Sequence, residues 1–351
     1  MTPIPCAAPA QSAIPFALPD IGESEINAVV SCLRSGWLTT GSRSAQFERD
    51  FARFMGGGVE GVTVASATAG LEIALSAHGI GPGDEVITTD YTFTATAMSA
   101  VHLGAKPVIV DIDADTFNID PNRIEAAVTA RTKAIIPVHF AGLPCEMAAI
   151  TAIAQRHGLK LIEDAAHALP ASWKQRIIGC GTSDATVFSF YATKTITTGE
   201  GGMITFVDPA IAKRARTLRL HGISKDISLR NGDASGRDWR YEVVAPGFKS
   251  NMSDIVASIG IVQLGRARAL YGRRAQIWAR YDAGLAGLPV LRPPHAQADD
   301  SHAFHLYALR LCEEAPLDRD SFIAEMAKAG IECGVHFIPL HLHPYWRDTL
   351  V

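Results

Sequence analysis

Apolar and polar positions alternate along the middle of the chain as short apolar runs separated by longer periodic segments. Between residues 61 and 206, seven apolar or β-branched runs of four or five residues predict buried strands. They are Val62–Ser66, Glu85–Thr88, Pro107–Asp111, Ala134–Val138, Leu159–Glu163, Ala185–Phe188 and Met203–Phe206. Helices are predicted between most of them, over Thr68–Ala77, Ala95–Leu103, Pro121–Val128 and Met147–His157. Strands that alternate with crossover helices are parallel, so this order predicts one α/β sheet of about seven strands.

The segments on either side of this region have other patterns. Before it, a helix is predicted over Glu23–Arg34, followed by an amphipathic helix that carries Phe47, Phe51 and Phe54 on one face. After it, the polar stretch Ser224–Asp238 is typical of a mobile loop. The remaining predicted helices are Pro209–Leu220, Asn251–Leu270, Arg273–Gly284 and Arg319–Ala329, and the remaining predicted strands are Ala303–Leu311 and Val335–Ile338. We therefore predict a loose tail (1–14), a large α/β domain (15–245) and a small α+β domain (246–351).

Composition narrows the class of protein. With 351 residues, 48% of them hydrophobic, the chain can bury a large core, and a formal charge of −4 gives no basic surplus for nucleic acid or an anionic membrane. The six cysteines are scattered without a C-x-x-C pair, which indicates neither a disulfide framework nor a zinc site. The N-terminus lacks the basic and apolar regions of a signal peptide, and no apolar run approaches the ~18–20 residues of a membrane span. We expect a cytoplasmic protein without a metal.

One lysine, Lys194, lies in a glycine-rich turn between the last two predicted strands. The stretch from Ser189 to Gly202 reads SFYATKTITTGEGG, which surrounds the lysine with hydroxyls and little side-chain bulk. A lysine that forms a Schiff base with an aldehyde has to be partly desolvated and held in place, and this position suits that role. A solvated loop cation is the alternative, and this stretch alone does not decide between the two.

Ligands bind at the carboxyl ends of the strands in an open α/β sheet, so the residues there are candidates for a site. The segment Ser66–Gly70 (SATAG) joins a predicted strand to a helix, and its small residues would allow backbone amides to reach a phosphate. A simple helix cap by Ser66 or Thr68 is the alternative, and it is favoured when this segment is taken alone. Tyr91-Thr-Phe93 follows another strand and offers an aromatic ring to a flat cofactor, although core packing is the commoner fate of a phenylalanine.

A carboxylate and a histidine follow the predicted strand that ends at Glu163. Asp164 would keep a ring nitrogen protonated and so make the ring an electron sink, and His167 would contact the same ring or its hydroxyl. A helix-capping aspartate and a satisfied core histidine are the alternatives for each alone. Together the four loops supply a phosphate cup, a carboxylate, an aromatic lid and a lysine at one edge of the sheet. This combination predicts a site for pyridoxal 5′-phosphate (PLP).

On these residues the chain resembles the DegT/DnrJ/EryC1/StrS family of PLP-dependent sugar aminotransferases, which have the aspartate aminotransferase-like fold (fold type I). The resemblance extends from about residue 16 to the end of the chain. The matching segments are Trp37–Gly41 (WLTTG), Gly79–Thr88 (GIGPGDEVIT), Glu163–His167 (EDAAH), Ser189–Lys194 (SFYATK), Gly199–Gly202 (GEGG), Asn251–Asp254 (NMSD) and Pro339–Pro344 (PLHLHP).

The resemblance implies a role for each residue of the predicted site. Lys194 would be the Schiff-base lysine and the proton shuttle, and Asp164 the partner of the pyridine nitrogen. His167 would lie at the ring and Phe93 would stack on it. The phosphate would be bound by Ser66, Ala67, Thr68 and Ser189.

Residues further along the chain are implied to complete the site. Asn251 would reach the phosphate of the neighbouring subunit, because family members are homodimers with shared sites; a helix N-cap is the alternative. His336, His341 and His343 cluster in the sequence without a Glu or Cys at ligand spacing, which favours substrate contact over a metal. We name His336 and Tyr91 as candidate substrate contacts.

Two features depart from the family pattern. The phosphate cup, usually Ser-Gly-Thr, reads Ser66-Ala67-Thr68 here, a small change that still allows close backbone approach. Family members usually continue beyond the position of Val351 with a closing helical segment, so we expect the small domain to be truncated.

The function implied is a homodimeric transaminase of polysaccharide biosynthesis. It would move an amino group from an amino acid, L-glutamate, to a nucleotide-linked keto-sugar. A PLP-dependent nucleotide-sugar dehydratase is one alternative, but that branch commonly replaces the lysine by histidine, and Lys194 argues against it. A non-catalytic PLP-binding regulator would carry a nucleic-acid-binding module, for which residues 1–20 are too short. A lyase or desulfurase on the same fold would need a reactive cysteine in a mobile loop, and we recognise none.

Overall fold

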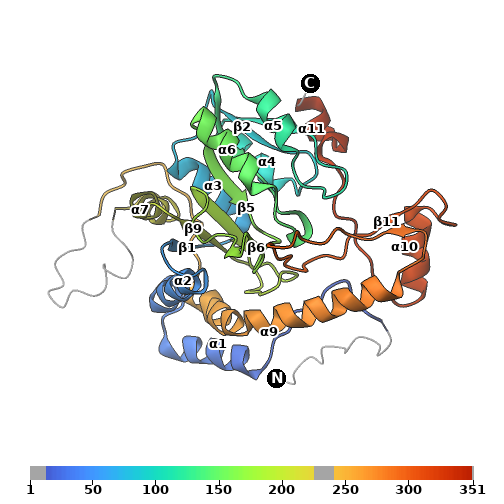
Figure 1. Ribbon diagram of the computed structural model, residues 1–351. Helices are drawn as coiled ribbons and strands as arrows, with labels where there is room; N and C mark the ends of the chain where they lie inside the picture. Colours follow the sequence, from blue (N-terminus) through green and yellow to red (C-terminus); the bar gives the residue numbers. More distant parts are fainter. Residues whose placement is uncertain (1–12, 225–240, 350–351) are drawn as a thin grey trace.

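A seven-stranded sheet lies at the centre of the computed structural model, which describes residues 13–224 and 241–349 (Figure 1). The strand order is β1-β9-β8-β5-β4-β2-β3; β9 is antiparallel to both neighbours, and the other pairs are parallel. The strands are β1 (Glu60–Val64), β2 (Glu85–Thr89), β3 (Lys106–Val110), β4 (Thr132–Ile136), β5 (Lys160–Asp164), β8 (Ala185–Ser189) and β9 (Gly202–Phe206). Each lies within two residues of its predicted bounds, which confirms the mostly parallel α/β sheet.

Side chains alternate between the two faces of this sheet, and helices cover both faces. The first face, which includes Ile162 and Val187, packs against α3, α4 and α7. The second face, which includes Leu161 and Phe188, packs against α2, α5, α6 and α9. The helices up to residue 218 are α1 (Glu23–Ser35), α2 (Ser42–Phe54), α3 (Ala67–Ala77), α4 (Ala95–His102), α5 (Pro121–Ala127), α6 (Met147–His157) and α7 (Pro209–Leu218), as predicted to within two residues at each end where bounds were predicted. The strands are buried on both faces, and this explains why their sequences are nearly continuous apolar runs.

The region after α7 differs from the prediction in one long helix. The two helices predicted over 251–284 form a single 31-residue helix, α9 (Asp254–Gly284), which runs along the base of the molecule in Figure 1. Tyr271-Gly272, where we expected a break, does not interrupt it. A glycine inside a helix costs only about 1 kcal/mol relative to alanine, and packing of α9 against α1 and α2 at one end and the aromatic segment 302–307 at the other outweighs that cost.

Of the two strands predicted near the C-terminus, one is much shorter than predicted and the other does not form. Only Arg310–Leu311 of the predicted strand 303–311 is paired, as β11 against β10 (Val290–Leu291), and no strand forms at 335–338. The amide of Ala303 donates instead to Gly142 O at 2.8 Å and that of His305 to Ala141 O at 3.2 Å, so the backbone bonds to a turn and not to a neighbouring strand. The described part also contains β6 (Ser172–Trp173), β7 (Arg176–Ile177), α10 (Arg319–Lys328), α11 (Pro344–Thr349) and two 3₁₀ turns (Phe140–Gly142 and Leu340–Leu342).

The start of α9 is tied to the loop before α2 by one carboxylate. Asp254 is 1% exposed; its Oδ1 accepts hydrogen bonds from Gly41 N (2.8 Å) and Ser44 N (2.9 Å), and its Oδ2 accepts one from Arg43 N (3.1 Å). The Ser44 hydroxyl also donates to Oδ1 at 2.7 Å. These bonds satisfy amides at the start of α2, so the carboxylate caps a helix 210 residues earlier in the chain.

Other predictions for the ends and loops have mixed outcomes. Ile14, in the segment predicted as a loose tail, pairs with Ile331: the Ile14 amide donates to Gly330 O at 2.7 Å, and the Ile14 carbonyl accepts a hydrogen bond from Glu332 N at 3.0 Å. The loop predicted over 224–238 lies outside the described residues except for Ser224. The division of the chain at residue 245 stays a prediction. In the described part of the chain, every helix is too short or too polar to cross a membrane.

Candidate active site

Four strands bring the predicted site residues to one edge of the sheet. Ser66 follows β1, Asp164 ends β5 and Ser189 ends β8, while Gly202 begins β9 opposite Ser189. Lys194 lies in the connection between β8 and β9, where its amide donates to Tyr191 O at 2.9 Å and closes a turn. The antiparallel β9 therefore returns the lysine loop to the edge where the parallel strands end.

The Lys194 amine has an altered proton affinity because it is largely buried. Burial lowers its pKa from 10.5 to about 8, and the Asp164 carboxylate acts in the opposite direction. At pH 7 a group of pKa 8 is about 10% unprotonated, whereas an ordinary lysine is about 0.03% unprotonated. The position therefore supplies a nucleophilic amine near neutral pH, as an aldehyde-trapping lysine requires.

Asp164 is a buried carboxylate held by two donors. The Thr96 hydroxyl donates to Oδ2 at 2.8 Å and the Ala166 amide to Oδ1 at 3.1 Å. Burial raises the pKa of Asp164, whereas these two hydrogen bonds and the positive charge of nearby Lys194 lower it. A carboxylate in this state gains from a cationic partner, and a protonated ring nitrogen is one.

The proton position on His167 follows from its backbone contact. Ala141 N donates to His167 Nδ1 at 3.3 Å, so the neutral ring carries its hydrogen on Nε2. Burial, then the positive charges at Lys194 and His336, keeps the pKa of His167 well below its usual value. His167 is therefore a neutral hydrogen-bond donor beside the lysine, the state needed to contact a ring oxygen.

The turn after β1 has the backbone features of a phosphate site. The Ser66 hydroxyl caps α3 by accepting a hydrogen bond from Ala69 N at 3.1 Å, so the helix-cap interpretation is correct for this residue. The amides of Ala67 and Thr68 are the first two of the helix and have no intrahelical acceptor. A Cβ on Gly202 would lie 2.9 Å from Ala67 N, so only glycine leaves that amide open. The turn fits an anionic phosphate at the positive end of the α3 dipole.

Aromatic side chains line the side of the site towards the C-terminal segment. Phe93 is 60% exposed, and its ring centroid lies 6.2 Å from that of Phe337, so one face of the ring is accessible to a flat molecule. Phe337 in turn stacks on His167 at 5.9 Å. The Tyr91 hydroxyl donates to His336 O at 2.6 Å, which places both candidate substrate contacts at this wall.

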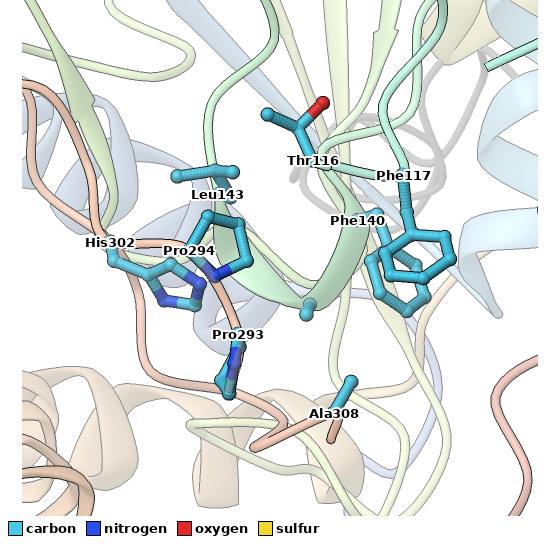
Figure 2. A pocket seen from close by; sticks show the side chains of 9 residues that line it. Thr116, Phe117, Phe140, Leu143, Pro293, Pro294, His302 and Ala308 are labelled. Carbon is cyan, nitrogen blue, oxygen red and sulfur yellow. The ribbon is translucent and has the colours of Figure 1, made fainter. Parts of the chain in front are cut away.

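His341, another histidine of the C-terminal cluster, has separate surroundings. His341 Nδ1 contacts Asp90 Oδ2 at 2.5 Å and the His341 amide donates to Asp90 Oδ1 at 3.0 Å, which fixes this segment to the end of β2. Figure 2 shows a pocket beside the site, where the 3₁₀ turn at Phe140 faces a proline pair and His302. Phe140 also contacts His167 edge-on, with ring centroids 6.4 Å apart, so this pocket and the site share a wall.

Asn251 lies beside the phosphate turn of its own chain. Ser250 O accepts a hydrogen bond from Ala65 N at 2.8 Å, and Asn251 Nδ2 donates to Thr40 Oγ1 at 2.6 Å. The ammonium group of Lys249 contacts Asn251 Oδ1. Ser253 caps α9 by accepting from Val256 N, so the alternative that Asn251 caps this helix is wrong.

Sequence reasoning missed three residues of the site. Thr96 donates to Asp164 from α4, Phe337 stacks on His167, and the buried His305 ring lies with its centroid 4.5 Å from that of His167. His305 Nδ1 has no hydrogen-bond partner within residues 13–224 and 241–349. Burial keeps the pKa of His305 well below its usual value, so this ring is also neutral. The pattern His302-x-x-His305 was the one sequence signal that could have drawn attention to it.

Comparison with known proteins gives consistent results. Residues 19–350 match the model of the DegT/DnrJ/EryC1/StrS aminotransferase family. The chain is 49% identical over 336 residues to the spore coat polysaccharide biosynthesis protein SpsC of Bacillus subtilis, covering 95% of this chain and 85% of SpsC. The PLP form of Spr1654 from Streptococcus pneumoniae superposes with a TM-score of 0.88 at 38% identity, covering 96% of this chain and 88% of that one. PseC of Helicobacter pylori, an aminotransferase involved in pseudoaminic acid biosynthesis, gives a TM-score of 0.87 at 28% identity over 96% of this chain and 88% of PseC.

Proposed function

The chain belongs to the DegT/DnrJ/EryC1/StrS family of PLP-dependent sugar aminotransferases, and on that premise we propose that it moves an amino group from an amino acid, L-glutamate, to a nucleotide-linked keto-sugar. The observation that carries the assignment of the site is the pairing of Lys194 with Asp164. One is an amine whose pKa burial lowers to about 8, and the other is a buried carboxylate at the same edge of the sheet. SpsC, whose name refers to polysaccharide biosynthesis, supports a sugar acceptor.

The cofactor supplies the electron sink of the reaction: its ring delocalises the electron pair left when a proton leaves the substrate carbon. In our proposal Asp164 would hold a proton on the ring nitrogen, and His167 Nε2 would donate a hydrogen bond to the ring hydroxyl. Phe93 would cover one face of the ring. The phosphate would be bound at the α3 turn by the residues named in the sequence analysis, Ser66, Ala67, Thr68 and Ser189.

Lys194 has two tasks in this scheme. Its Nζ would bind the cofactor covalently in the absence of substrate. With an amino acid in the site, the free amine would accept the proton from the substrate carbon and return it elsewhere. A pKa near 8 suits both tasks, because the amine is neither fully protonated nor a poor acid at neutral pH.

We also propose that the enzyme is a homodimer whose sites are shared, with Asn251 reaching the phosphate of the neighbouring subunit. The family resemblance supports this, and Lys249, whose ammonium group contacts Asn251 Oδ1, adds a cation suited to anions. Tyr91 and His336 are proposed to face the acceptor sugar, since the Tyr91 hydroxyl donates to His336 O in the aromatic wall that contains Phe93 and Phe337.

The test of the site is chemical trapping. Borohydride treatment of the holoenzyme should fix the cofactor on Lys194, which peptide mass spectrometry would locate, and should abolish the visible absorption band. The Lys194→Ala variant should show neither the adduct nor transamination of a panel of nucleotide-linked keto-sugars with glutamate as donor. Lys174 is an exposed lysine in the turn between β6 and β7. Lys174→Ala is therefore the matched control and should behave as wild type. Full turnover by Lys194→Ala would refute the assignment.

A further inference from the structure

A fully buried pair of polar side chains lies directly behind Asp164. Glu163 and His139 are both 0% exposed, and His139 Nε2 is 2.8 Å from Glu163 Oε2. The Thr186 hydroxyl donates to the other carboxylate oxygen, Oε1, at 3.0 Å. Within the described residues, Glu163 has no lysine or arginine partner. A carboxylate taken out of water without such a partner is costly, so a pair of this kind calls for a functional explanation.

The hydrogen bonds around His139 fix its charge. Cys145 N donates to His139 Nδ1 at 3.1 Å, so Nδ1 presents a lone pair and the single ring hydrogen is on Nε2, directed at Glu163. Burial lowers the pKa of His139, whereas Cys145 and Glu163 raise it, to about 10. An imidazolium would nevertheless place a second hydrogen on Nδ1, facing the amide hydrogen of Cys145. Because the amide cannot turn away, the neutral ring is the form that the backbone accepts, so His139 would leave a negative charge on Glu163 without neutralisation.

The backbone holds Glu163 and Asp164 next to each other. Glu163 and Asp164 are consecutive residues of β5, and Asp164 is held further by its own amide donating to Pro137 O (2.9 Å) and its carbonyl accepting from His139 N (3.2 Å). The groups that face the Asp164 carboxylate from the surrounding elements are the Thr96 hydroxyl, the Ala166 amide and the Lys194 ammonium. All three favour the charged carboxylate, whereas its burial acts against it; a negative charge on Glu163 would act in the same direction as burial.

We propose that Glu163 is a positioning residue for the transamination, whose buried negative charge raises the proton affinity of Asp164 and of the ring nitrogen that Asp164 holds. This inference rests on the proposed role of Asp164. At an effective dielectric constant of about 20, two carboxylates within about 10 Å of one another change each other's proton affinity about 15-fold or more. Glu163 thereby keeps the proton on the ring nitrogen at a pH where Lys194 is already partly neutral, which separates the titrations of the two groups.

The test uses holoenzyme loaded with PLP labelled with ¹⁵N at the ring nitrogen, whose chemical shift reports protonation. Glu163→Gln preserves shape and an acceptor for His139 but removes the charge. We expect the ring nitrogen to lose its proton 1–2 pH units lower than in wild type, a 10- to 100-fold change, and kcat to fall while KM stays constant. Glu85→Gln, which removes another buried carboxylate at the start of β2, is the matched control and should leave the titration unchanged.

The results distinguish a failure of the proposal for Glu163 from a failure of the proposed role of Asp164. A folded Glu163→Gln enzyme with the wild-type nitrogen titration would overturn the proposal and leave Glu163 a structural residue. If Asp164→Asn also left that titration unchanged, the proposed role of Asp164 would itself be wrong. Should Glu163→Gln fail to fold, ¹⁵N-histidine spectra of the wild-type holoenzyme decide, with the His139 signals assigned by their loss in His139→Gln. One protonated nitrogen on His139 supports the proposal, and two would refute it, because an imidazolium would neutralise Glu163.

Discussion

The lowered pKa of Lys194 predicts how fast the cofactor-free protein captures PLP at different pH values. Only the unprotonated amine attacks an aldehyde, and burial lowers the pKa of this amine from 10.5 to about 8. The rate constant for covalent capture should therefore rise with pH, reach half of its maximum near pH 8 and level off above it. At pH 7 the rate should be about 300-fold above that expected for an unperturbed lysine, the ratio of the two unprotonated fractions.

The pKa of Lys194 can also be shifted by removing the charge of Asp164. Asp164 raises the pKa of Lys194, so Asp164→Asn should move the half-maximal rate below pH 8. The measurement is stopped-flow absorbance of the visible band at a series of pH values, with Lys194→Ala as the control that should show no covalent phase. A rate that keeps rising through pH 10.5 in the wild-type protein would refute the argument that burial sets this pKa. A shift to higher pH in Asp164→Asn would show that the two groups are not coupled as described.

Two further predictions concern the second subunit and the stability of the site. If Asn251 acts across the dimer, mixing Lys194→Ala subunits with a disabled Asn251 variant should restore activity, because both lesions fall in one site of the heterodimer and leave the other intact; no recovery in proven heterodimers would place Asn251 in its own subunit's site. Removing the Asp254 carboxylate leaves the amides of Gly41, Arg43 and Ser44 without their acceptor, so Asp254→Ala should cost about 3–5 kcal/mol in urea unfolding and Asp254→Asn about 1–2 kcal/mol. Equal stability of the alanine variant and wild type would contradict this cap.

The sequence predicted the sheet and the lysine turn because their signals are local. A buried strand is a short apolar run, and the residues that follow such runs share one edge of a parallel sheet, so Asp164 and Ser66 could be placed there before the structure was known. Placing Lys194 at the same edge also required β9 to run antiparallel to β8. The short glycine-rich connection between the two strands allows this.

The parts that were missed depend on contacts between distant segments. Thr96 reaches Asp164 across 68 positions, and no local pattern announces that contact. The segment 303–306 has the composition of a strand, but the turn at Ala141 takes its hydrogen bonds. A Cβ on Gly142 would lie 2.8 Å from Ala303 Cβ, so this approach is close enough to require glycine. His305 enters the site through the same contact, and only the folded chain reveals it.

The unbroken course of α9 limits how this chain can vary in length. Its first turn is fixed to the loop before α2 by Asp254, and Trp278, nearly seven turns later, packs with its ring centroid 4.5 Å from that of His302. Each residue inserted between these points would rotate one end about 100° relative to the other and lengthen the helix by about 1.5 Å. An insertion of four residues would restore the angle but displace Trp278 by about 6 Å. The length of α9 between residues 254 and 278 therefore sets the distance between the loop before α2 and the segment at His302, and insertions there should disturb the fold more than insertions in exposed loops.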